Sequence, residues 1–191
     1  MKILDVKKVH GKKINLADYT HLLAYHACRA EDGQAYRTQG LKPYTKDEAL
    51  STAIHKLECD RVCQKDIETK FEELWGTLSK SVYLMLETTE LLGPSSHYLI
   101  YGSEFINALA MHLGCRDRLK EIGKPMFVVC AVPISDIHEV WLDGLEQAIR
   151  RKDTANRSIA VSRVAAENVI DILYPTGVVR DPYSWRNFKL R

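Results

Sequence analysis

The sequence predicts an α+β domain with a mostly antiparallel sheet flanked by helices. Apolar runs typical of strands alternate irregularly with stretches of helical periodicity, without the regular alternation of a doubly wound fold. No glycine-rich phosphate loop follows a predicted strand. The chain has 191 residues and is 46% hydrophobic, which suffices for one domain with its own core. We therefore expect a single domain over residues 1–191, with a core at about 20–174, a basic N-terminal arm and a C-terminal tail.

Charge and cysteine content narrow the class of protein. The net charge of +2 gives no global field that would attract nucleic acid or a membrane. No apolar run approaches the roughly 20 residues of a spanning helix, and the chain does not open on a signal-peptide pattern. Five scattered cysteines fit reduced thiols better than a disulfide framework. These features predict a cytoplasmic protein with no membrane partner.

Six stretches are predicted to form strands. The run at 126–132 is the most hydrophobic in the chain and ends at Pro133, which indicates a central strand. The run at 22–28 is apolar except near its end, where His26 and Arg29 stand. The other predicted strands are at 81–86, 97–101, 158–164 and 168–173.

Helical periodicity is clearest after Thr45, which begins a capping-box pattern with Glu48. Apolar residues then recur at helical spacing, so we expect this helix to continue through Cys63. A second helix is expected over 65–80, with an apolar face that reaches Leu78. Further helices are predicted at 104–113, 116–122 and 135–152.

Polar residues at the ends of two predicted strands are the candidate functional residues. His26 and Arg29 stand where a core strand ends, although packing alone requires neither. Ser103 and Glu104 follow another predicted strand and open the next helix, so that side chains and amides converge there. Structural roles explain the same residues: a core histidine and a surface ion pair for the first two, and a helix cap with a favourable dipole interaction for the second two.

One group of residues has metal-ligand chemistry. His55, Cys59 and Cys63 follow one another at steps of four and share a face if one helix carries them all. A zinc site, however, takes four ligands from separate elements, and the sequence contains no second cluster. We therefore expect no metal.

The early part of the chain resembles ADP-ribosyltransferase-like domains. A strand ending in YHACR, then a turn passage that closes on Gly40-Leu41 before a capped helix, is similar to the opening of such domains. The runs MFVVCAVP and AENVIDIL are similar to their back half, so the resemblance covers about residues 20–174. The chain lacks the Glu-x-Glu and Ser-Thr-Ser patterns of the family.

The resemblance implies a split sheet, NAD as substrate, and a role for several residues. It makes His26 the residue that holds the NAD ribose, and Tyr83 the aromatic that stacks on nicotinamide, with Tyr101 as a substitute. It makes Glu104 the candidate catalytic glutamate, with Ser103 beside it at the cofactor. Arg29 is placed to meet the pyrophosphate, because a guanidinium fork suits phosphate oxygens.

The expected function is that of an NAD-dependent ADP-ribosyltransferase or NAD glycohydrolase. The sequence does not choose between protein, nucleic acid and a small molecule as acceptor. A different hypothesis is a non-catalytic module that binds nucleic acid through basic segments at 1–13, 150–163 and the tail. A third is a thiol enzyme in which Cys28 acts with His26.

Overall fold

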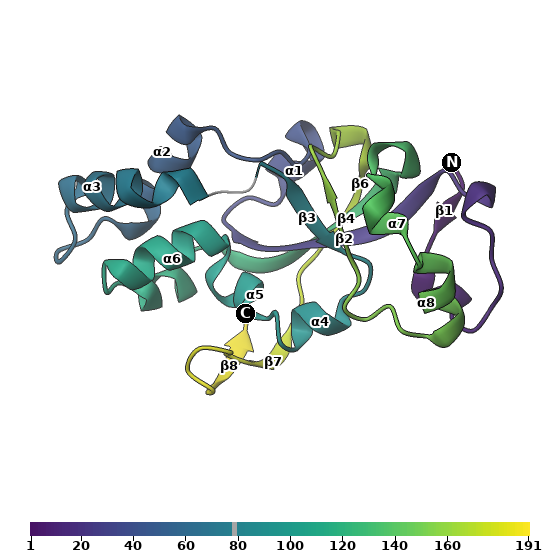
Figure 1. The fold of residues 1–191 in the computed structure, drawn as a ribbon. Helices are drawn as coiled ribbons and strands as arrows, with labels where there is room; N and C mark the ends of the chain where they lie inside the picture. The colour runs from purple at the N-terminus through teal and green to yellow at the C-terminus, as the bar shows by residue number, and fades with distance from the viewer. Residues whose placement is uncertain (78–79) are drawn as a thin grey trace.

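The computed structural model describes residues 1–77 and 80–191, and it contains a six-stranded sheet (Figure 1). Five strands lie in the order β5-β3-β2-β4-β6, and β1 pairs with β2. Only β1 and β2 run parallel; the other neighbours are antiparallel, which confirms the predicted fold class. The strands of the sheet are β1 (Ile3–Leu4), β2 (His21–Ala30), β3 (Val82–Met85), β4 (Lys124–Pro133), β5 (Ser158–Val161) and β6 (Val169–Leu173).

The sheet is continuous on one side of β2 and split on the other. β2 and β4 pair over their full length, from His21 opposite Pro133 to Ala30 opposite Lys124. Among the described residues, β2 and β3 pair only where Tyr25 lies opposite Met85. The two strands therefore diverge beside the centre of the sheet.

Alternate residues of β2 and β4 feed two hydrophobic clusters, one on each face of the sheet. Leu22 and Val128 belong to the cluster that α8 and the N-terminal segment cover. Ala27 and Phe127 belong to the cluster formed with α2, α3, α5 and α6. The α-helices are α1 (Gln34–Gln39), α2 (Lys46–Leu57), α3 (Gln64–Leu74), α4 (Thr89–Leu92), α5 (His97–Tyr101), α6 (Glu104–His112), α7 (Glu139–Leu142) and α8 (Leu145–Arg151).

The two ends of the sheet carry different structures, as Figure 1 shows. Helices α2, α3 and α6 gather at one end, and the N-terminal segment lies with α7 and α8 at the other. The tail forms a separate hairpin of β7 (Gly177–Arg180) and β8 (Asn187–Leu190). The described residues also form six 3₁₀ helices: η1 (Val6–Val9), η2 (Leu16–Asp18), η3 (Trp75–Thr77), η4 (Arg116–Lys120), η5 (Ile134–Asp136) and η6 (Ala166–Asn168).

Three of the predicted elements differ from the structure. Residues 97–101 form the helix α5 and not a strand. The helix that begins after Thr45 ends at Leu57, because Glu58 has an extended backbone. The stretch 135–152 is divided into η5, α7 and α8, since Gly144 has a φ of 66° between the last two. Leu78, predicted on the apolar face of the second helix, lies outside the described residues.

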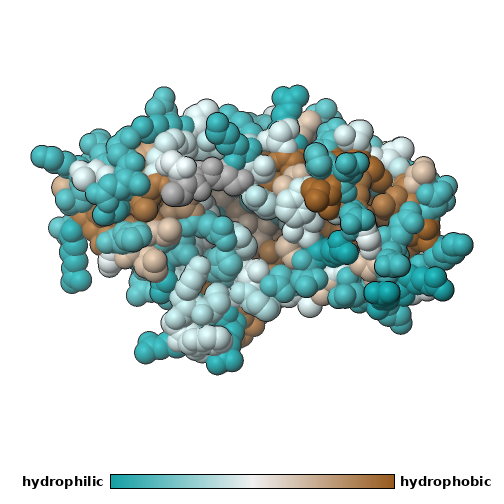
Figure 2. Space-filling model, in the orientation of Figure 1, coloured by the Kyte–Doolittle hydropathy of each residue, from teal (hydrophilic) through white to brown (hydrophobic). Residues whose placement is uncertain are grey.

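The surface is mixed in character. On the face drawn in Figure 2, apolar side chains gather mainly over the half that carries α7, between hydrophilic ones. Val140 of α7 is 65% exposed. None of the helices in the described part of the chain has the length and apolar character needed to cross a membrane.

Candidate functional site

His26 lies at the split between β2 and β3. Its Nδ1 is 3.0 Å from the carbonyl oxygen of Tyr83. Because a carbonyl can only accept, Nδ1 carries the proton and Nε2 is left as an acceptor. Burial lowers the pKa of His26, although the bond to the carbonyl opposes that shift. The ring is therefore neutral at pH 7, and no hydrogen bond to its Nε2 occurs within the described residues.

Tyr83 lies on β3, and its backbone carbonyl is the partner of His26 at the split. It is 48% exposed, and its ring meets Trp141 edge-on with 6.1 Å between the centroids. The backbone of Tyr83 thus orients His26 while its side chain faces outward. The structure brings together two of the residues that the sequence singled out.

Glu104 opens α6, and its carboxylate is anchored by α5. Its Oε1 accepts a hydrogen bond from the hydroxyl of Tyr98 at 2.6 Å, while two thirds of the side chain remains exposed. Burial raises the pKa of Tyr98. The hydrogen bond to Glu104 and the negative charge of that carboxylate raise this pKa further, and the phenol of Tyr83 adds to the shift. Tyr98 therefore ties the carboxylate of Glu104 to α5.

Arg29 lies in the interior and is not available to a ligand. Its side chain is buried, and its guanidinium donates to the carbonyl oxygens of Ile122, Lys120 and Leu99. Burial lowers its pKa. The predicted contact with a pyrophosphate is therefore not what this geometry offers: Arg29 ties α5 and the segment 120–122 to β2.

Tyr101 and Ser103 are also placed differently from the expectation. Tyr101 is 2% exposed, and its hydroxyl donates to Asp181 at 2.5 Å. The cationic groups of Arg116 and Lys120 lie over its ring. A nicotinamide ring has no access to it, so Tyr83 is the better aromatic candidate. Ser103 is exposed at the N-cap position of α6, and its side chain makes no capping bond.

Two polar residues beside Glu104 were missed by the sequence analysis. The Nε2 of His97 lies 3.5 Å from Glu104. Burial lowers the pKa of this imidazole, although the carboxylate of Glu104 acts to raise it. Asn107 is 5% exposed, and its amide nitrogen donates to the hydroxyl of Tyr183 at 3.3 Å. Within the described part of the chain, His97 Nε2 and Asn107 Oδ1 are buried without a hydrogen-bond partner. Of the two, His97 is the one that lies close to the Glu104 carboxylate.

The metal and thiol hypotheses find no matching geometry. His55 pairs with Glu31 at 2.7 Å, and Cys63 is the N-cap residue of α3, so the three spaced residues do not share one helix. No group of three or more metal-ligating side chains forms among the described residues. Burial raises the pKa of Cys28 to about 11, which leaves a neutral thiol and a poor nucleophile at pH 7.

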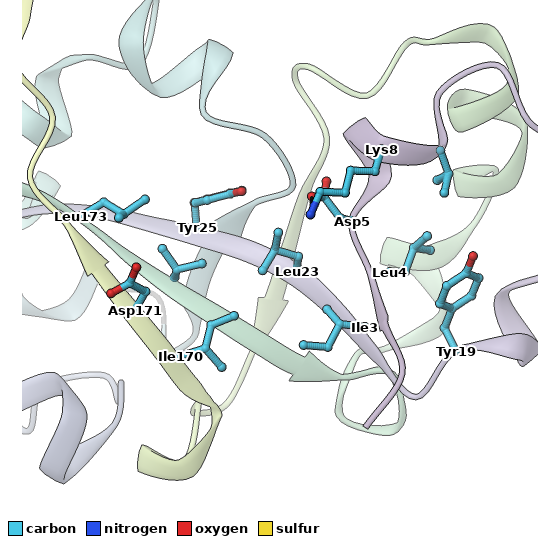
Figure 3. A pocket seen from close by; sticks show the side chains of 12 residues that line it. Ile3, Leu4, Asp5, Lys8, Tyr19, Leu23, Tyr25, Ile170, Asp171 and Leu173 are labelled. Carbon is cyan, nitrogen blue, oxygen red and sulfur yellow. Dashed lines mark ion pairs between the residues drawn. The ribbon is translucent and has the colours of Figure 1, made fainter.

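A hollow of about 630 Å³ lies away from these residues, on the open face of the sheet (Figure 3). Leu23 and Tyr25 of β2 and Leu173 of β6 line it, and β4 runs between these two strands (Figure 3). Its acidic side chains are already paired, Asp5 with Lys8 and Asp171 with Arg37. The hollow therefore offers mainly apolar surface, and the split remains the better candidate for chemistry.

Comparisons with models of protein families, with curated proteins and with solved structures found no match to this chain.

Proposed function

We propose that the chain binds NAD at the split between β2 and β3, and either transfers its ADP-ribose to an acceptor or hydrolyses it. The observation that supports this most directly is the state of His26. A neutral imidazole with Nδ1–H bound to a backbone carbonyl presents Nε2 to a hydroxyl donor. The hydroxyls of a ribose are such donors. The fixed orientation of the ring favours one position for that sugar.

The reaction breaks the bond between the anomeric carbon of the ribose and the ring nitrogen of nicotinamide. The bonding electrons leave with nicotinamide, which becomes neutral, and positive charge develops on the ribose. A carboxylate at that point stabilises the charge. An oxygen or nitrogen of the acceptor, or water, then bonds to the same carbon and gives up a proton.

Glu104 is the carboxylate that we assign to this step. Tyr98 donates to one of its oxygens, which fixes the side chain and leaves the other oxygen available. The exposed ring of Tyr83 is the candidate surface for nicotinamide. Arg29 acts at a distance, because it holds α5, the helix from which Tyr98 projects.

The first test is NAD binding measured by calorimetry, with His26→Ala and a matched exposed histidine, His112→Ala, as control. We expect binding that is lost in His26→Ala and kept in His112→Ala. Nicotinamide release is measured in parallel for Glu104→Gln and for Glu121→Gln, which alters an exposed carboxylate elsewhere. We expect the first to slow release by about 10²-fold or more and the second to leave it unchanged.

The two measurements contradict different parts of the proposal. Absence of NAD binding at millimolar concentration would refute the function as a whole. NAD binding with full turnover in Glu104→Gln would refute only the choice of carboxylate.

A further inference from the structure

Two basic segments that are far apart in the sequence lie side by side at one end of the molecule. The backbone N–H of Gly11 donates to the carbonyl of Ile149 in α8 at 3.0 Å. The N–H of Leu16 donates to Glu146 of the same helix at 2.7 Å. Figure 1 shows the N-terminal segment running beside α8. The lysine-rich arm is therefore fixed against the arginine-rich end of α8.

A buried polar network strengthens this attachment. Nε2 of His10 lies 2.6 Å from the hydroxyl of Thr154, just beyond α8. The same nitrogen is 3.2 Å from Glu87, which also accepts from Thr154. Thr154 and Glu87 are almost completely buried. The arm thus has a defined position, and the spacing between its charges and those of α8 is set before any partner binds.

We call the surface formed by residues 5–13 and 146–153 the arm–α8 surface. It has seven cationic residues and three acidic ones, whereas the whole chain carries a net charge of only +2. The positive charge is therefore concentrated here, and the remaining residues are net negative. All seven cations are exposed: Lys7, Lys8, Lys12, Lys13, Arg150, Arg151 and Lys152.

Most of these cations have no partner of their own. Lys8 pairs with Asp5 at 3.4 Å and is the exception. No ion pair or side-chain hydrogen bond engages the other six within residues 1–77 and 80–191. Arg157, also part of the basic stretch in the sequence, donates instead to the carbonyl of Asp143 and is only half-exposed. The surface is thus a cluster of uncompensated charge.

We propose that the arm–α8 surface binds the phosphate backbone of a nucleic acid. Exposed, unpaired Lys and Arg side chains neutralise phosphates and release condensed counterions, which is the main source of sequence-independent affinity. Two adjacent arginines at the end of α8 add the bidentate geometry that suits phosphate oxygens. The inference stands independently of NAD chemistry at the split.

The composition of the surface distinguishes this partner from an anionic membrane. Peripheral membrane proteins combine basic residues with exposed apolar side chains that enter the lipid. Every exposed large hydrophobic residue of the described chain lies outside residues 5–13 and 146–153. The arm–α8 surface lacks such an anchor and is suited to a partner held by charge alone.

The test is fluorescence anisotropy with labelled single-stranded RNA, single-stranded DNA and duplex DNA of about 16 nucleotides, over about 50–200 mM salt. The variant changes Lys12, Lys13, Arg150 and Arg151 to Gln. Because all four are exposed and unpaired, we expect the variant to melt like the unchanged protein. The matched control changes Arg180, Arg186, Lys189 and Arg191, cations of the C-terminal tail, to Gln.

We expect the arm–α8 variant to bind at least about tenfold more weakly at low salt, and its plot of log K against log salt to be shallower by about 3 units. The tail variant keeps most of the affinity. Equal losses in the two variants would refute the surface, because the effect would then follow net charge. Tighter binding to a polyglutamate peptide or to phosphatidylserine vesicles than to any of the oligonucleotides would also refute it, in favour of an acidic protein or a membrane.

Discussion

At the scale of single residues, Asp181 joins the C-terminal hairpin to the rest of the molecule. It is 2% exposed and accepts hydrogen bonds from the hydroxyls of Tyr101 and Ser184 at 2.5 and 2.7 Å. Burial alone would raise the pKa of Asp181, but these bonds and those from the backbone of Tyr183 and Ser184 outweigh it, so the pKa is lowered. The carboxylate is therefore ionised at neutral pH and saturated with donors.

Replacing Asp181 by Ala is expected to lower the free energy of unfolding by about 2–3 kcal/mol, because four donors, among them the buried hydroxyl of Tyr101, lose a charged acceptor at once. Tyr101→Phe removes one of these donors and is expected to cost about 1 kcal/mol. Urea unfolding followed by tryptophan fluorescence measures both. Equal effects of the two variants would show that the hydroxyl of Tyr101 accounts for the whole contribution of Asp181.

The candidate site shows what residue patterns reveal and what they leave out. The sequence singled out His26 and Tyr83, but their contact spans 57 positions and depends on where two strands diverge. Arg29 illustrates the opposite case: an arginine near the end of a core strand is compatible with a ligand or with buried carbonyl groups, and only the fold decides between them. Tyr98 was missed because the run that contains it was interpreted as a strand.

At the scale of elements, α2 has the signal that sequence alone identifies best. The hydroxyl of Thr45 accepts from the N–H of Glu48 at 3.3 Å, and the carboxylate of Glu48 accepts from the N–H of Thr45 at 2.8 Å. This reciprocal pair satisfies two backbone donors that the first turn of a helix leaves open. The predicted capping box is confirmed.

Thr45→Ala is expected to lower the free energy of unfolding by about 1 kcal/mol, whereas Thr45→Ser keeps the oxygen and most of the stability. Thermal denaturation of the two variants in parallel gives the comparison. If both variants melt at the same reduced temperature, the loss comes from the methyl group of Thr45 and not from its hydroxyl.

The wrong prediction at 97–101 has a physical cause. Leu99, Ile100 and Tyr101 are buried, and a short buried run is equally apolar whether it forms a helix or a strand. A local signal was present in Gly102, which has a φ of 82° and donates its N–H to the carbonyl of Tyr98. Glycine in this position often ends a helix. Strands β2 and β4 are longer. They were predictable because each contains more consecutive apolar residues than a short helix would.

At the scale of the whole molecule, stability should depend on pH through two histidines. Burial lowers the pKa of His26 and of His97 in the folded protein, so the unfolded chain takes up protons first as the pH falls below about 6.5. Stability is then lost on acidification, by up to about 1.4 kcal/mol per pH unit for each histidine until its folded-state pKa is reached. Above about pH 7 both histidines are neutral in the folded and in the unfolded state, so they no longer make stability depend on pH.

Urea unfolding of the unchanged protein and of His26→Gln between pH 7.5 and 5 checks this expectation. The variant should show a smaller loss of stability on acidification, while His112→Gln, at an exposed position, should behave like the unchanged protein. An unaltered pH slope in His26→Gln would mean that the ring is protonated as readily in the folded state as in the unfolded one.

The pairing of β2 with β4 also has a consequence for the protein during its synthesis. β2 ends at Ala30, but the strand that covers its whole length begins only at Lys124. At a translation rate of roughly 5–20 residues per second, β2 remains unpaired with β4 for several seconds after it is synthesised. Such exposed segments are where nascent chains aggregate or meet chaperones, so residues 21–30 are the part of the newly made chain most in need of protection.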